Sequence, residues 1–505
     1  MAQTTFDLHE LTLTRELAEV HAFDLTGDGR KELIVIEADK TQRQIAHFVR
    51  VFLHQDDGFL PIPGAEAQLP PEVAVTGVGM FSGVPGLAMI LPREVVVWSW
   101  RDGQFQPKTT ANKATDTLFA QAGGSLKRGI PWIVDLNDDS NHELAVPVST
   151  GFELFTHQEN RLQPMVDFSL RPKSRVWDSL HRRLLAVELP TVVFPEGATH
   201  KHMLVFSDGM VNVFPLGAAG RNQPALRLDF QPPKPFDPKG PEDPPLRLVM
   251  AKDLDQDGLF DLVFAKNSAT DSTFRTSTRI LVHYGQNRES GESGEEAKNS
   301  ALPHFNLKPD QVFVSEGFTF PIFLDLNSDQ RTDMVLVNVE VGFWNAVKAF
   351  IARSVTAQAA FYLMPAQGRF TQQPNKLVDY TVTFTLGRDT HKPLAVFGDF
   401  NGDGRPDLLL SKDKETLGLH WGQPDGLWQG DPDAKITGAF PVHQRDILVE
   451  DLDGDGRDDL ILRLGRRDYR QMPEMNGKFA VMMSRFPFPK RKVAQHHPTD
   501  YQSVP

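Results

Sequence analysis

The chain has 505 residues, and its composition excludes several classes of protein. Lysine and arginine number 53 against 66 aspartate and glutamate residues, a net charge of −13, and no basic block offers a surface to nucleic acid. Hydrophobic residues make up 40%, enough for a large core, but no apolar run is long enough to cross a membrane. Cysteine is absent, which excludes disulfides. We therefore expect no nucleic-acid partner and no membrane-spanning segment.

An acidic phrase of nine residues recurs six times along the chain. Its copies begin at Asp24, Asp135, Asp253, Asp325, Asp399 and Asp451. Position 1 is Asp, position 3 carries a side-chain oxygen, position 5 is Asp and position 9 is Asp or Glu. Apolar runs flank the phrase, such as Leu33–Ile36 after the first copy and Leu394–Phe397 before the fifth. This pattern predicts a repeated β-hairpin whose connection is the acidic loop.

The side chains at positions 1, 3, 5 and 9 and the backbone carbonyl at position 7 supply the hard oxygen ligands that Ca²⁺ prefers. An EF-hand is excluded because position 12, for example Val35 or Leu410, is apolar in every copy. A plain Asp-Gly hairpin turn without metal is the alternative. The copies at 399, 451 and 253 match the calcium pattern more fully than those at 24, 135 and 325.

The candidate metal residues are Asp24, Thr26, Asp28, Arg30 and Glu32; Asp135, Asn137, Asp139, Asn141 and Glu143; Asp253, Asp255, Asp257, Leu259 and Asp261; Asp325, Asn327, Asp329, Arg331 and Asp333; Asp399, Asn401, Asp403, Arg405 and Asp407; and Asp451, Asp453, Asp455, Arg457 and Asp459. The six loops hold 22 of the 66 acidic residues. We therefore expect the acidic residues of the loops to be ligands for up to six structural Ca²⁺ ions.

The run from Phe397 to Leu408, Phe-Gly-Asp-Phe-Asn-Gly-Asp-Gly-Arg-Pro-Asp-Leu, resembles the FG-GAP or VCBS repeats of integrin-α-like β-propellers. In that family such loops bind calcium in successive blades. The resemblance implies an all-β propeller with four-stranded antiparallel blades. The N-terminal run Phe6–Leu13 would then add a strand to the last blade and close the ring.

The spacing of the loops indicates the number of blades. The first two gaps, 111 and 118 residues, are wider than the 72, 74 and 52 that follow, and each contains a strand–turn–strand pattern without the acids, at 75–90 and at 184–206. Eight blades are therefore favoured, with seven as the alternative. We expect one propeller over 1–486, with units starting near 18, 73, 131, 183, 247, 320, 394 and 446, and a polar tail over 487–505.

Residues 341–360 depart from the strand pattern, because apolar residues recur there with a period near 3.6. We expect an amphipathic helical insertion with Trp344, Val347, Phe350 and Ile351 on one face. Such a helix either covers the propeller's own surface or binds a protein partner.

No catalytic motif is present, so we predict a non-catalytic, calcium-stabilised scaffold that binds or assembles proteins at the cell envelope. No signal peptide is visible, but millimolar calcium sites suit the periplasm or the cell exterior. The resemblance leaves two alternatives. One is a glycan-binding, lectin-like module that stacks sugars on tryptophans such as Trp98, Trp100, Trp421 or Trp428. The other is a propeller-fold polysaccharide lyase.

Overall fold

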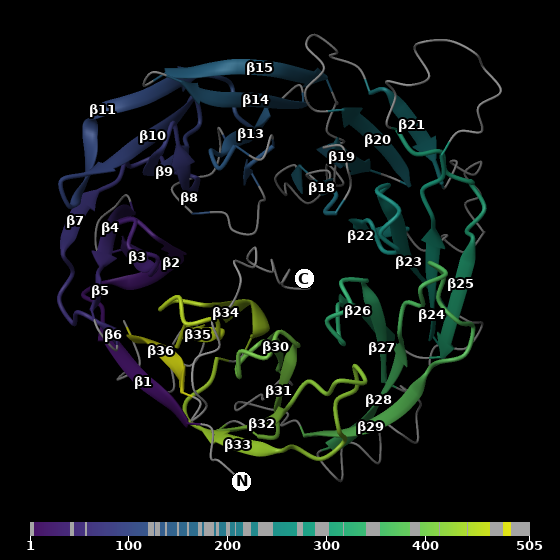
Figure 1. Ribbon diagram of the computed structural model, residues 1–505. Helices are drawn as coiled ribbons and strands as arrows, with labels where there is room; N and C mark the ends of the chain where they lie inside the picture. Colours follow the sequence, from purple (N-terminus) through teal and green to yellow (C-terminus); the bar gives the residue numbers. More distant parts are fainter. Residues whose placement is uncertain are drawn as a thin grey trace, which may run out of the picture.

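The protein is an eight-bladed β-propeller (Figure 1). Eight four-stranded antiparallel sheets surround a central axis, and each runs from an inner strand to a strand at the rim. The prediction of eight blades is confirmed, and the seven-bladed alternative is wrong. The computed structural model describes residues 5–40, 45–55, 58–119, 126, 132–136, 139–148, 151–158, 161–169, 174–175, 186–187, 191–197, 202–207, 209–215, 224–230, 246–269, 276–287, 302–316, 318–339, 354–383, 394–413, 415–441, 443–464 and 478–485.

The first four blades follow one another along the chain, each from its inner strand outward. Blade 1 is β2 (Glu16–Phe23), β3 (Glu32–Asp39), β4 (Ala46–Phe52) and β7 (Ala65–Gln68). Blade 2 is β8 (Val75–Phe81), β9 (Val84–Ile90), β10 (Glu94–Arg101) and β11 (Gln104–Ala114). Blade 3 is β12 (Ile133–Val134), β13 (Glu143–Val148), β14 (Gly151–Gln158) and β15 (Arg161–Ser169). Blade 4 is β18 (Thr191–Val193), β19 (His202–Ser207), β20 (Met210–Pro215) and β21 (Leu226–Asp229).

The remaining blades continue the same order. Blade 5 is β22 (Arg247–Lys252), β23 (Asp261–Ala269), β24 (Thr276–His283) and β25 (Gln311–Glu316). Blade 6 is β26 (Phe318–Leu324), β27 (Asp333–Val339), β28 (Ser354–Tyr362) and β29 (Lys376–Thr383). Blade 7 is β30 (Ala395–Gly398), β31 (Asp407–Ser411), β32 (Thr416–His420) and β33 (Ala434–Thr437). Blade 8 is β34 (Ile447–Glu450), β35 (Asp459–Leu462), β36 (Lys478–Arg485) and β1 (Thr5–Thr12).

Three short elements lie outside the blades. The pairs β5 (His54–Gln55) with β6 (Gly58–Phe59) and β16 (Ser174–Arg175) with β17 (Ala186–Val187) form two-stranded sheets, and Gln444–Asp446 forms a single 3₁₀ turn.

The second strand of each blade is packed on both faces, because neighbouring blades stack face to face around the ring. In β3 the continuous apolar run Leu33–Ile36 is fully buried. Leu33 and Val35 pack toward blade 8, whereas Ile34 and Ile36 pack toward blade 2. The rim strand β7 instead alternates between half-buried and exposed residues. Continuous apolar runs therefore mark the interior strands, as strands buried on both faces require.

The ring is closed by the N-terminal strand, as the sequence suggests. Strand β1 pairs along its whole length with β36, from Thr5 opposite Arg485 to Thr12 opposite Lys478. Leu11 and Leu13 pack in one apolar cluster with Val20 of blade 1 and Val481 of blade 8. The first and last segments of the chain therefore share one sheet and one core.

A buried carboxylate holds the connection between β1 and β2 against blade 1. Glu37 on β3 is fully buried and accepts hydrogen bonds from the Thr14 backbone N–H at 3.2 Å and from Arg15 at 3.2 Å. The buried Arg50 on β4 donates at 3.2 Å to Oε1, the oxygen that also accepts the Thr14 N–H, whereas Arg15 donates to Oε2. The charge of Glu37 is thus balanced where the chain crosses from blade 8 to blade 1.

We expect Glu37→Gln to lower the free energy of unfolding by about 1.5–3 kcal/mol, because the buried Arg50 loses one of its two carboxylate partners and keeps Glu66, which is 38% exposed. Urea denaturation with folding monitored by circular dichroism measures this. Glu16→Gln, which removes a solvent-exposed pairing with Lys40, is the matched control and should change stability by less than about 1 kcal/mol. Equal effects of the two substitutions would contradict the assignment.

One expectation drawn from the sequence is wrong. Residues 354–360, placed in a helix, belong to strand β28, where Ala357, Ala359 and Phe361 are buried and alternate with exposed Thr356 and Gln358. The alanines of this strand obscure its period of 2. The rest of the predicted helix, with Trp344, Val347, Phe350 and Ile351, lies outside the described residues. In the degenerate fourth unit, at 184–206, the inner strand is Thr191–Val193, the run that pairs with β19.

Candidate metal centres

Each acidic loop joins the inner strand of a blade to the second strand. The loops of blades 1, 3, 5, 6, 7 and 8 begin at Asp24, Asp135, Asp253, Asp325, Asp399 and Asp451. Inner strands run in the same direction in every blade of an antiparallel propeller. All six loops therefore lie at one end of the ring, close to its axis (Figure 1).

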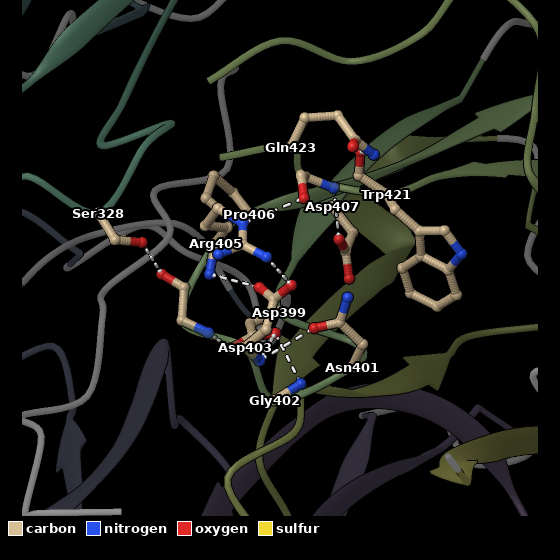
Figure 2. Close-up of polar contacts among 12 residues, drawn as sticks. Ser328, Asp399, Asn401, Gly402, Asp403, Arg405, Pro406, Asp407, Trp421 and Gln423 are labelled. Carbon is tan, nitrogen blue, oxygen red and sulfur yellow. Dashed lines mark hydrogen bonds and ion pairs between the residues drawn. The ribbon is translucent and has the colours of Figure 1, made fainter. Parts of the chain in front are cut away.

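The aspartate at position 1 organises the turn of its loop. In all six copies one carboxylate oxygen accepts the backbone N–H of position 6, at 2.6–2.9 Å. In the loop of blade 7, the other oxygen of Asp399 accepts the N–H groups of Gly402 at 2.7 Å and Asp403 at 3.0 Å (Figure 2). A tight turn leaves these backbone donors without strand partners, and the carboxylate satisfies them.

The turn also needs left-handed backbone at positions 4 and 6. Gly402 and Gly404 have φ of 74° and 81°, which glycine adopts without strain. In the loop of blade 6 the same positions are Ser328 and Gln330, at 60° and 69°. Glycine stands at position 4 in three of the copies and at position 6 in four.

The acid at position 9 is buried in every copy. Glu32, Glu143, Asp261, Asp333, Asp407 and Asp459 are each at most 1% exposed. One oxygen accepts the backbone N–H of position 2, at 2.8–3.0 Å in all six loops. Where position 9 is Asp, the second oxygen accepts an N–H at or just beyond the end of the third strand, such as Gly422 for Asp407 at 2.8 Å.

The aspartate at position 5 faces the residue at position 7. Its carboxylate accepts the position-7 backbone N–H at 2.7–3.0 Å in all six loops. It also pairs with the guanidinium of Arg30, Arg331, Arg405 or Arg457 where position 7 is arginine. The position-5 carboxylate is therefore the least available of the loop acids as a metal ligand. An arginine at position 7 can supply only its backbone carbonyl oxygen to a metal.

Two loops bring three carboxylates to one point. One oxygen each from Asp253, Asp255 and Asp261 lies within 4.8 Å of the others, and so do those of Asp451, Asp453 and Asp459. These are positions 1, 3 and 9. The Oδ1 atom of Asp255 is buried and has no hydrogen-bond partner, and a Cβ on Gly368 of blade 6 would lie 2.7 Å from Oδ2 of the same residue. This arrangement of hard oxygens, one of them orphaned, fits a calcium ion.

The other four loops vary in their oxygen sets. In the loop of blade 7 the three positions are Asp399, Asn401 and Asp407, where an amide oxygen replaces one carboxylate. Asn327 in blade 6 and Thr26 in blade 1 have the same place in their loops. Asn137 in blade 3 lies outside the described residues. Blade 2 has a hairpin without this set, at Phe81–Val84, and in blade 4 the sequence between β18 and β19 contains a single acid, Glu196.

Burial raises the pKa of the carboxyl groups at position 9, because a buried charge loses its hydration. The pKa rises to about 8 for Asp261 and Asp459 and to about 7 for Asp333. The pKa of Asp407 lies well above its usual range for the same reason. Backbone hydrogen bonds oppose the shift, and the other acids of the loop add to it. A bound cation would favour the ionised forms.

The loops of neighbouring blades are joined to one another. The backbone N–H of position 8 donates to the preceding hairpin: Lys31 to Leu452 at 2.8 Å, His142 to Met80 at 2.7 Å, Thr332 to Leu254 at 3.2 Å and Asp458 to Asp399 at 2.8 Å. Position 8 in blade 7 is Pro406, which has no N–H. There the hydroxyl of Ser328 donates to the carbonyl of Gly404 instead (Figure 2). The sequence analysis did not consider position 8.

The loop geometry agrees with a comparison to known families. Residues 399–462, which span the loops of blades 7 and 8, match the model of the FG-GAP-like repeat. The chain carries an FG-GAP-like repeat. No curated protein sequence matches the chain.

Solved structures match the chain at low identity. They include BBS1N in complex with ARL6DN (9% identity, 97% of this chain and 99% of that one, TM-score 0.39) and the Vibrio cholerae biofilm matrix protein Bap1 (12%, 97% and 92%, 0.34). A third is an Agrocybe aegerita lectin that recognises non-reducing terminal N-acetylglucosamine (12%, 86% and 90%, 0.40). At these TM-scores the similarities carry no argument about function. Among the described residues, no helix has the length and apolar character needed to cross a bilayer.

With calcium removed by EGTA, we expect the free energy of unfolding to fall as the pH rises from 7 to 8.5. Asp261, Asp333 and Asp459 bind protons more tightly in the folded than in the unfolded chain, so ionisation destabilises the folded state from about pH 4 until pH exceeds about 8. Buried histidines such as His283, whose pKa is lowered by desolvation, act in the opposite direction but mainly below pH 7.

Urea denaturation at fixed ionic strength measures this slope. Asp459→Asn removes one of the three groups and should make the slope shallower. A stability that stays constant or rises over pH 7–8.5 would contradict the role assigned to these carboxyl groups.

Proposed function

We propose that this propeller is a calcium-stabilised, non-catalytic scaffold that binds or assembles other proteins at the cell envelope, in the periplasm or outside the cell. The observation that carries the calcium assignment is the convergence of positions 1, 3 and 9 in the loops at 253 and 451. The FG-GAP-like repeat over 399–462 supports it.

Calcium would be held by the carboxylates at positions 1, 3 and 9, with the carbonyl of position 7 as a further oxygen. The ion supplies positive charge to a cluster of buried acids and no chemistry beyond that. The residues of the chain perform the rest: position 1 fixes the turn, and position 9 ties the loop to the end of the third strand. Each blade would therefore be held as a rigid unit, and the ring would present a fixed surface.

The exposed apolar side chains on the rim support a role in binding. Val312 and Val314 on β25 are 37% and 63% exposed, and Leu307, which precedes this strand, is 60% exposed. Rim strands also keep an unpaired edge, to which an extended segment of a partner can add a strand. These features favour a protein partner.

The described tryptophans do not favour the glycan alternative. Trp98, Trp100 and Trp428 are 5%, 7% and 2% exposed, and they pack in the clusters between blades. Such side chains offer no free face to a sugar. Trp421 is half-buried beside the core of blades 7 and 8.

We expect 2 mM Ca²⁺ to raise the melting temperature relative to EGTA. With dissociation constants of 10⁻⁴–10⁻³ M, each occupied site adds about 0.7–1.8 kcal/mol to the free energy of unfolding. Asp255→Asn and Asp453→Asn should each reduce the calcium-dependent shift. Asp102→Asn, in an exposed turn of blade 2 outside the acidic loops, is the matched control. An unchanged melting temperature in EGTA would overturn the metal assignment.

The scaffold role is tested by affinity capture from the envelope fraction of the source organism, with millimolar calcium or with EGTA. We expect a stoichiometric protein partner that is recovered with calcium and lost in EGTA, and weaker recovery with the Val312→Lys/Val314→Lys double variant. Lys376→Glu on β29, a neighbouring rim strand, controls for a general change of surface charge. Recovery of polysaccharide instead of protein would contradict the proposal.

A further inference from the structure

At the junction of blades 7 and 8, one residue of the later loop forms hydrogen bonds to the preceding loop through both its backbone and its side chain. At four junctions the backbone N–H of position 8 donates to the preceding hairpin, and side chains such as Lys31, Gln256 and Ser328 form further contacts between neighbouring blades. In blade 8 the carboxylate of Asp458 also accepts the backbone N–H of Asp399, at 2.7 Å, while the Asp458 N–H donates to the Asp399 carbonyl at 2.8 Å. Asp399 is position 1 of the loop of blade 7. Both the N–H and the carbonyl of Asp399 are therefore hydrogen-bonded to one residue of the next loop, Asp458.

The two loops pack closely around this junction. A Cβ on Gly402 would lie 3.0 Å from Cγ of Arg457 and 3.3 Å from the carbonyl oxygen of Gly456. Asp458 is adjacent in sequence to Asp459, the position-9 ligand of its own loop. It interacts electrostatically with both Asp399 and Asp451, which are the first residues of the two loops. Asp458 is thus linked to the candidate ligands of both sites.

A related clamp is found where the preceding hairpin has no acids. His142, at position 8 in blade 3, donates its backbone N–H to the Met80 carbonyl at 2.7 Å, and its Nδ1 accepts the Met80 N–H at 3.1 Å. Met80 lies in the degenerate hairpin of blade 2. The clamp itself therefore does not require a metal loop on both sides. At the junction of blades 7 and 8, where both loops carry candidate ligands, the side chain that accepts the N–H of the preceding loop is a carboxylate.

We propose that Asp458 is a positioning residue that couples the loops at 399 and 451, so that a cation bound in one loop raises the affinity of the other. This inference rests on the proposed calcium binding. A cation in the loop of blade 8 fixes Asp459 and with it Asp458, and Asp458 in turn fixes the backbone of Asp399. The carboxylate of Asp458 also carries negative charge between two cations that would otherwise repel each other.

The chain contains a reporter for the loop of blade 7. The indole N–H of Trp428 donates to the Pro406 carbonyl, position 8 of this loop, at 2.8 Å. Trp421 stands beside Asp407 in Figure 2, and the next residue, Gly422, donates to Asp407. Terbium(III), which uses the same hard oxygen ligands as calcium, would be sensitised by these two indoles. The emission that is lost in a Trp421→Phe/Trp428→Phe variant then reports occupancy of this loop.

The test is a terbium titration of the full chain, read by this emission and checked by competition with calcium. Disabling the loop of blade 8 with Asp453→Ala should weaken terbium binding at the loop of blade 7 by about 5-fold or more. In an Asp458→Ala background, Asp453→Ala should have no further effect. Asp458→Asn keeps the acceptor for the Asp399 N–H without the charge, and it separates the contribution of ordering from that of charge. It also serves if Asp458→Ala does not fold.

His142→Ala is the matched control, since it removes the corresponding clamp far from the reporter and should leave the titration unchanged. An Asp453→Ala variant that binds terbium at the loop of blade 7 as tightly as the parent would overturn the coupling. The same coupling with and without Asp458 would overturn the role of this residue. If terbium gives no calcium-sensitive emission in the parent protein, the proposed calcium binding itself fails.

Discussion

Six of the blades depend on one kind of hydrogen bond. In each acidic loop, carboxylates accept the backbone N–H groups that the nine-residue hairpin connection leaves without strand partners. Position 1 takes the donors of the turn, and position 9 takes the donor of position 2. In blades 5 to 8, position 9 also takes a donor at the end of the third strand. The N–H of position 2 is buried and would be unfavourable by about 1–3 kcal/mol if it were unsatisfied, whereas the N–H of position 6 is exposed in most loops. The loops therefore have a structural use for their acids before any cation binds.

The same carboxylates repel one another and lose hydration on burial. Concentrating carboxylates where they are buried raises their pKa, and desolvation is the main cause. The position-5 aspartates pair with the arginines at position 7 in four loops, whereas the pKa of the position-9 carboxyl groups is raised by burial and by the other acids of the loop. Positions 1, 3 and 9 thus combine a fixed geometry with unfavourable charge, the combination that a divalent cation relieves. The ion pair between positions 5 and 7 and the acids at positions 1, 3 and 9 therefore have different functions in the loop.

Much of this arrangement could be predicted from the sequence, because it depends on local repeats. The spacing of the acidic phrases gave eight units, and the apolar run at Phe6–Leu13 indicated the closing strand. What the sequence could not reveal are contacts between blades. Asp458 reads as one more acid in a dense loop, and its role depends on Asp399, which is brought beside it only by the packing of blades 7 and 8. Likewise, alanine and valine occur in both helices and strands, so the sequence of residues 354–360 does not distinguish the two. These residues form a strand because they pair with β27 and β29.

The pairing of β1 with β36 has a consequence for how the chain folds. Leu8 meets Met482, so the contacts that complete blade 8 join residues from nearly opposite ends of the sequence. Contacts of such long separation form slowly, since the intervening chain must be ordered first. During synthesis on the ribosome, β1 is made before the other described strands of the propeller, whereas its partner β36 is made after them. Its exposed edge is then open to pairing with another nascent copy, and domain-swapped dimers are the misfolded product that this topology favours.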